Sequence, residues 1–438
     1  MKQYKIAYLL IALTAMFASC TEDGGPSIDD HFLNYEIPDV PVTQDCVVGA
    51  YFVDPGSNGL SDAIWGRLTS LEFDPANGLY SPAMLPVTGN WKHGNFPNSS
   101  ASNPTPLQAM VELFQQEIDW AVEAGIDFFI LPMVGEDANR LYPLNINANS
   151  IKFYNVFTGR VGSDGKPSDE TAGTRVDLKG IKYAIMINAG NFTGSLNQTT
   201  PIENAAPTTI EGVSTSRIMR YYEFVRRVSD YFEDENYFTV DGKPMMVIGG
   251  TPHNMYALDT RALYDGMRNH IKDKSTWGKD IYIVAQQDPW NPSARFQYTF
   301  GEGHVDAVTI KNEGGMYNNG DSQRYRLYPQ MIDQNWKYNR DFLLATWGED
   351  FIPSVSPAYI RWVQSGGNYN FPIMEHDPQT FITYCNVAKR NLGKNNIVII
   401  DSFNHWTFDT AIEPTDPTYG KGYGTEYLDI VRKQFKVK

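Results

Sequence analysis

Residues 121–133 read AVEAGIDFFILPM, the end of an amphipathic helix followed at once by a short apolar strand. The helix is expected from about Pro106 to Ala124, where apolar residues recur at helical spacing. The strand, Asp127–Met133, is apolar along almost its whole length, which is typical of a buried strand in a parallel sheet. This unit therefore predicts an α/β fold.

Short apolar runs of the same kind recur on both sides of this unit. Eight of them are predicted as buried strands: Val47–Val53, Asp127–Met133, Lys182–Asn188, Met245–Gly249, Ile281–Ala285, Val305–Ile310, Phe342–Thr346 and Asn396–Ile400. Further helices are expected near 216–232, 323–338, 379–392 and 425–435. Strands that alternate with helices form parallel βαβ units, so eight of them predict a (β/α)8 TIM barrel.

The length of 438 residues allows two or three domains, but the pattern favours one barrel over residues 42–438. A doubly wound sheet is the alternative, although no GxGxxG or P-loop motif follows a strand. Three segments rich in Asn, Thr, Ser, Pro and Gly are expected to be long βα loops on the binding face: Gly56–Thr105, Arg140–Lys179 and Asn191–Val213.

The N-terminus has the pattern of an export signal. Lys2 and Lys5 precede the apolar run Ile6–Phe17, and small residues then lead to Cys20. We expect residues 1–19 to be a signal peptide, Cys20 to be lipidated, and residues 20–41 to form a tether. The protein is therefore expected to be an exported lipoprotein of the outer membrane at the cell surface, with the periplasm or an ordinary secretory signal as alternatives.

The acidic composition limits the classes of ligand that the protein is expected to bind. The formal net charge is −15, from 36 Lys+Arg and 51 Asp+Glu, which argues against nucleic acid and favours neutral ligands. No HExxH, EF-hand or GxSxG motif occurs, so we expect no metal, no cofactor and no nucleophilic serine. Cys46 and Cys385 are expected to be buried free thiols, and a disulfide between them is the alternative.

The residues just beyond the predicted strands are polar, aromatic and rich in carboxylates. Chemistry in a (β/α)8 barrel lies at this end of the strands. Amides and carboxylates bind sugar hydroxyls, and indole rings stack on sugar rings, so the set indicates glycan binding. The expected substrate-binding residues are Asn188, His253, Asp288, Trp347, Asn404 and Trp406.

The stretch Asp401–Gly420, DSFNHWTFDTAIEPTDPTYG, resembles the C-terminal signature of WbsX-type proteins and of glycoside hydrolase family 99. The family pattern runs Asn-Glu-Trp-x-Glu-Gly, then Glu-Pro and Tyr-Gly. VVGAYFV, AVEAGIDFFILP and ENYFTVDGKPMMVI resemble its first, second and fourth strands in the same order. The resemblance covers about residues 46–436 and implies a (β/α)8 barrel that acts on or binds glycans.

The family's two glutamates fall on His405 and Phe408 when the motif is aligned without gaps. A phenylalanine transfers no proton, whereas a histidine does so near neutral pH. We therefore expect Asp409 and Glu313 to be the catalytic carboxylates, assisted by His405. Three functions follow: a glycoside hydrolase acting on a neutral polysaccharide or oligosaccharide, a catalytically inactive surface glycan-binding protein, or a WbsX-like polysaccharide-assembly protein.

Overall fold

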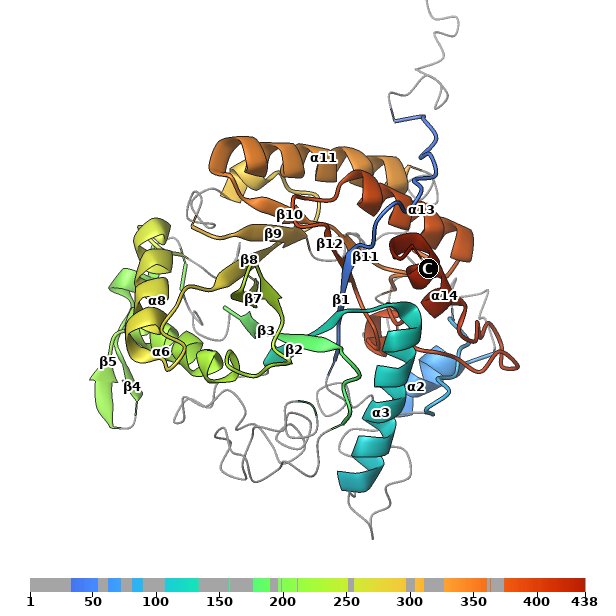
Figure 1. Ribbon diagram of the computed structural model, residues 1–438, viewed down its shortest axis with the longest axis horizontal. Coiled ribbons are helices and arrows are strands. Elements are labelled where there is room, and N and C mark those ends of the chain that lie inside the picture. Colours follow the sequence, from blue (N-terminus) through green and yellow to red (C-terminus); the bar gives the residue numbers. More distant parts are fainter. Residues whose placement is uncertain are drawn as a thin grey trace, which may run out of the picture.

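The computed structural model describes residues 33–53, 62–71, 81–89, 107–133, 157, 176–189, 196–197, 199–210, 212–250, 256–296, 304–310, 327–360, 363 and 374–437. Its central element is a ring of parallel strands with helices outside (Figure 1). The parallel strands are β1 (Val47–Tyr51), β2 (Phe128–Met133), β3 (Lys182–Asn188), β7 (Lys243–Gly249), β8 (Tyr282–Gln287), β9 (Ala307–Ile310), β10 (Asp350–Ile352), β11 (Ser354–Val355) and β12 (Ile397–Ile400).

The ring closes at Pro353, the residue that separates β10 from β11. β10 pairs with β9, and β11 pairs with β12, which in turn pairs with β1. Ile399 N donates to Pro353 O at 3.0 Å, and Asp401 N donates to Val355 O at 2.7 Å. Since proline has no N–H to donate, it stands where the segment changes partner. β10 and β11 thus act as the seventh of eight strands, which confirms the predicted (β/α)8 barrel.

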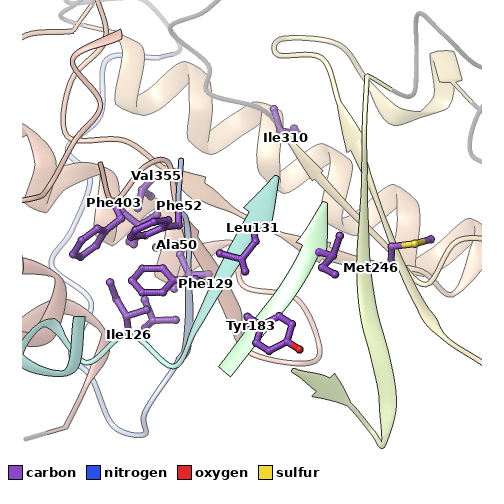
Figure 2. Packing of buried hydrophobic residues seen from close by; sticks show 14 of the residues in the cluster. Ala50, Phe52, Ile126, Phe129, Leu131, Tyr183, Met246, Ile310, Val355 and Phe403 are labelled. Carbon is purple, nitrogen blue, oxygen red and sulfur yellow. The ribbon is translucent and has the colours of Figure 1, made fainter. Parts of the chain in front are cut away.

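Side chains alternate between the interior of the ring and the helical layer. On β2, Phe128 and Ile130 belong to the interior cluster, whereas Phe129 and Leu131 belong to the outer one. The interior cluster takes alternate residues from the other strands too: Ala184, Met245, Val247, Tyr282, Val284, Ala307, Ile352, Ile397 and Ile399. Figure 2 shows part of the outer cluster. Burial on both faces explains why these strands are apolar throughout.

The outer layer consists of helices α2 (Asp62–Thr69), α3 (Leu107–Ala124), α6 (Arg217–Val228), α8 (Thr260–Lys274), α11 (Tyr328–Trp347), α13 (Pro378–Arg390) and α14 (Glu426–Phe435). Their starts follow local rules: Ser216, Asp259 and Asp377 each accept a hydrogen bond from a backbone N–H three residues on. Short 3-10 turns η3 (Ile202–Asn204), η4 (Ser229–Tyr231), η5 (Ser293–Phe296) and η7 (Trp406–Phe408) complete the layer.

Three antiparallel strands lie outside the ring pattern. β4 (Thr208–Ile210) and β5 (Val213–Thr215) form a hairpin, and β6 (Thr239–Val240) pairs with β7. Part of the predicted loop Asn191–Val213 is thus a hairpin strand, and the predicted loop Gly56–Thr105 contains α2.

The predicted strand Phe342–Thr346 is wrong, because these residues form the last turns of α11. Leu344 is 55% exposed, so its apolar side chain does not mark a buried strand. The real strand segment, Asp350–Val355, contains an aspartate, a proline and a serine and has little apolar signal. The other seven predicted strands are confirmed within a few residues at each end.

The N-terminal segment 33–45 lies against the helical layer. Tyr35 Oη donates to Asp333 Oδ2 on α11 at 2.9 Å, and Asn386 Nδ2 on α13 donates to Asp39 Oδ1 at 2.9 Å. Lys389 Nζ, also on α13, donates to Val40 O at 2.6 Å. We call residues 33–45 the N-terminal strap. It includes the end of the expected tether, whereas residues 1–32 lie outside the described residues.

The prediction for the two cysteines can be compared with the structure. Cys46 and Cys385 are buried free thiols, as expected, and no disulfide joins them. Among the helices in the described ranges, none is both long and apolar enough to cross a bilayer.

Candidate functional site

A polar layer lies at the top of the barrel interior, where the strands end. Tyr51 on β1 follows the inward-facing Val47 and Gly49, and Gln286 on β8 follows Tyr282 and Val284. These two strands are four positions apart in either direction around the ring. Gln286 Nε2 donates to Tyr51 Oη at 3.0 Å, so the pair bridges the interior. We call this pair the floor of the barrel mouth.

Asp401 brings a negative charge beside this floor. It follows β12 directly, is half-buried, and continues the inward alternation of Ile397 and Ile399. Burial raises the pKa of Tyr51, and the charge of Asp401 raises it further. The phenol therefore stays protonated at neutral pH, and it can donate a hydrogen bond while its oxygen accepts the one from Gln286.

His405, Phe408 and Tyr359 form an aromatic row on the rim. The rings of Phe408 and Tyr359 stack at 5.6 Å between centroids and 15° between planes. The ring of His405 meets Phe408 edge-on at 4.9 Å and 85°. His405 and Phe408 thus lie on one half-buried loop after β12. His405 follows β12, so it lies at the mouth end of the strands.

Asp409 lies on the inner side of the same loop. Its side chain is fully buried and lies 3.2 Å from Nε2 of His376, so it does not reach solvent in this structure. Its φ of 59° is in the left-handed region, where glycine is the favoured residue.

Trp406 is 3% exposed and belongs to a buried polar cluster behind the mouth. Its Nε1 donates to Glu413 Oε2 at 2.9 Å, and Thr88 Oγ1 donates to Glu413 Oε1 at 2.7 Å. Burial raises the pKa of Glu413 to about 7. Burial also raises the pKa of the neighbouring Glu117 on α3, and the charge of Glu413 adds to that effect. The indole of Trp406 therefore holds the loop and presents no open face to a sugar.

The other predicted residues fall in different places. Asn188 is the exposed last residue of β3, and the half-buried Asp288 directly follows β8, so both lie at the mouth end. Asn404 is buried, and its Oδ1 accepts a hydrogen bond from Val53 N at 2.8 Å. Trp347 ends α11 and precedes β10, which places it at the opposite end of the strands. Outside the described residues lie Cys20, His253 and Glu313.

Tyr51 and Tyr359 are the site residues that sequence reasoning missed. Tyr51 sits inside an apolar run, where it looks like core. The signal that could have found it is the alternation in VVGAY, which puts Val47, Gly49 and Tyr51 on one face. Tyr359 comes from an irregular segment after β11 and carries no comparable signal. Among the residues in the described ranges, no group of three His, Cys, Asp or Glu side chains is arranged to hold a metal.

The ring and its mouth define a (β/α)8 barrel. The chain is similar to a solved structure described as a glycoside hydrolase-like protein, with 24% identity and a TM-score of 0.69, over 94% of this chain and 99% of that one. It is also similar to the GH99 endo-alpha-mannosidase from Bacteroides thetaiotaomicron, with 15% identity and a TM-score of 0.52, over 90% and 97% of the two chains. These similarities establish the fold. No protein-family profile and no curated protein sequence matches the chain.

Proposed function

We propose that this protein binds a neutral glycan at the mouth of its barrel. The observation that carries the proposal is the floor formed by Tyr51 and Gln286, with Asp401 beside it and Asn188 exposed at the same end. A phenol, two amides and a carboxylate offer both donors and acceptors to sugar hydroxyls. The excess of acidic over basic residues disfavours polyanionic glycans. The similarity to the GH99 endo-alpha-mannosidase makes an α-mannan the first ligand to test.

Glycoside hydrolysis is the second candidate. It is favoured by Asp401 and Asp288, two half-buried carboxyl groups at the strand ends, and by the nearby imidazole of His405. Hydrolysis needs two carboxyl groups on either side of the scissile bond. Glu313, which follows β9, is a further candidate for one of them. The burial of Asp409 supports binding more than it supports the catalytic role predicted for that residue.

A panel of soluble polysaccharides tests both functions. It should include α-mannan, xylan and mixed-linkage β-glucan as neutral polymers, and polygalacturonate as an anionic one. Binding is measured by affinity gel electrophoresis and cleavage by the release of reducing ends. We expect at least one neutral polymer to be bound and the anionic one not to be. Failure to bind any neutral polymer would refute the proposal.

Variants then separate binding from cleavage. Asp401→Asn should weaken binding about 10- to 100-fold, because it removes a charged hydrogen-bond acceptor from the mouth. Asp341→Asn, which changes an exposed carboxylate on α11, is the matched control and should bind as the native protein does. Release of reducing ends that disappears in Asp401→Asn or Glu313→Gln would establish hydrolysis. If the native protein binds a polysaccharide but releases no reducing ends from it, its function is binding rather than hydrolysis.

We also propose that the mature protein is anchored to the outer membrane by a lipid on Cys20 and faces the cell surface. The signal-like pattern before Cys20 supports this proposal. The native protein should partition into the detergent phase, and Cys20→Ala should move it to the aqueous phase. Protease added to intact cells should degrade a surface protein and spare a periplasmic one. Equal partitioning of the two proteins would contradict the lipid anchor.

A further inference from the structure

We propose that Phe408 and Tyr359 form a stacking platform for one sugar ring, with His405 as the polar group at its edge. This subsite deepens the proposed function and rests on it. Its ligand would be a pyranose of a neutral glycan that presents a C–H face to the aromatic ring. Phe408 would then determine which sugar the mouth accepts.

The two rings come from loops that topology places side by side. β11 and β12 are neighbours in the ring, with Val355 paired to Ile400. Tyr359 follows β11 by four residues, and Phe408 belongs to η7, soon after β12. Tyr359 is 6% exposed, whereas Phe408 is half-buried. Tyr359 therefore covers one face of the Phe408 ring, while part of Phe408 remains accessible.

The backbone fixes this platform before any ligand arrives. Ile360 N donates to Phe408 O at 2.9 Å, which ties the two loops together beside the stacked rings. Nε2 of His376 donates to Asp409 O at 3.1 Å and holds the next residue. His405 N donates to Ser402 Oγ at 2.9 Å. A preorganised ring loses little conformational entropy on binding, so its contacts contribute more fully to affinity.

Polar groups lie where a stacked sugar needs them. The rings of His405 and Phe408 lie 4.9 Å apart between centroids at 85° between planes, so the imidazole adjoins the platform. Asp401 begins the same loop and faces the barrel interior next to Tyr51. An aromatic face with hydrogen-bonding groups at its edge matches the two surfaces of a pyranose, which has apolar C–H faces and a polar rim.

The proposal also explains the departure from the family motif in chemical terms. In the gap-free alignment with the family 99 motif, Phe408 stands at a position where the motif has a carboxylate. Tyr359 gives this ring a parallel partner at 5.6 Å. Under that alignment, the platform offers a binding surface at the place of a reactive group.

The test uses Phe408→Leu, which keeps apolar packing on Tyr359 but removes the aromatic face, and Phe408→Trp, which enlarges it. The control is Tyr338→Ala. Tyr338 is an exposed ring that also stacks on a neighbour, Phe342, at 5.9 Å and 10° on α11, away from the mouth. Dissociation constants are measured for α-mannan and mixed-linkage β-glucan. Circular dichroism and thermal unfolding verify that each variant is folded.

We expect Phe408→Leu to bind about 10-fold more weakly, Phe408→Trp to bind at least as tightly as the native protein, and Tyr338→Ala to be unchanged. Native-like binding by Phe408→Leu would overturn the platform while leaving the proposed function intact. An equal loss in Tyr338→Ala would overturn it as well. If the native protein binds neither polymer, the proposed binding of these two glycans is refuted, and the platform proposal is refuted with it.

Discussion

Replacing Glu413 with glutamine should make the stability of the protein less dependent on pH. The carboxyl group of Glu413 is fully buried and accepts hydrogen bonds from Trp406 and Thr88. Glutamine has nearly the same shape, keeps a carbonyl oxygen for Trp406, and places an amide near the hydroxyl of Thr88, which can accept from it. The variant thus keeps the shape of the side chain and removes its ionisation, and with it the charge that adds to the raised pKa of Glu117.

The magnitude follows from the pKa of Glu413 in the two states. Burial raises it to about 7 in the folded protein, against 4.5 for an ordinary glutamate in the unfolded chain. Between these values the folded state binds a proton that the unfolded state has released. The free energy of unfolding therefore falls as pH rises from about 4.5, and the loss is complete above about 7. At about 1.4 kcal/mol per pH unit, the total is about 3 kcal/mol.

Urea unfolding at pH 5, 6, 7 and 8, followed by tryptophan fluorescence, measures this effect. Glu413→Gln should be close to the native protein at pH 5 and about 3 kcal/mol more stable relative to it at pH 8. Glu233→Gln, which changes an exposed glutamate, should show no such trend. A constant difference between native protein and Glu413→Gln across this range would refute the reasoning, and so would an equal slope in the control.

Three further changes test the backbone and the mouth. Asp409→Gly should be about 1 kcal/mol more stable to urea than Asp409→Ala, because φ is 59° there and both variants lack the carboxylate; equal stabilities would contradict this. Gly49→Ala should lower stability by about 1–3 kcal/mol, because a Cβ would clash with the Phe128 ring; a native-like urea midpoint would count against this packing. Tyr51→Phe should cost about 1 kcal/mol and weaken glycan binding in gels several-fold, because Gln286 loses its acceptor; the floor has no role in binding if affinity is unchanged.

The barrel could be predicted from the sequence because a parallel strand buried on both faces is an unbroken apolar run. β2 and β3 are found almost residue for residue in this way. The seventh strand fails the same rule, since Asp350, Pro353 and Ser354 interrupt it. Its boundaries depend on which neighbour each half pairs with, and a single sequence does not contain that information.

The residues at the mouth could be predicted from the sequence only where they directly follow or end a predicted strand. Asn188, Asp288 and His405 lie at that end because each follows or ends a strand on the expected side. Whether a loop side chain points outward depends on loop geometry. Trp406 turns inward to Glu413, although it adjoins His405 in the chain. Spacing alone does not distinguish these two orientations.

The N-terminal strap gives the protein a mechanical property. Any tension on the chain before Leu33 reaches Tyr35, Asp39 and Val40 first, and these residues are bonded to α11 and α13 rather than to the strands. Several hydrogen bonds spread along the segment share such a load. The strap would yield before β1 is pulled, so the mouth would keep its shape under such a load.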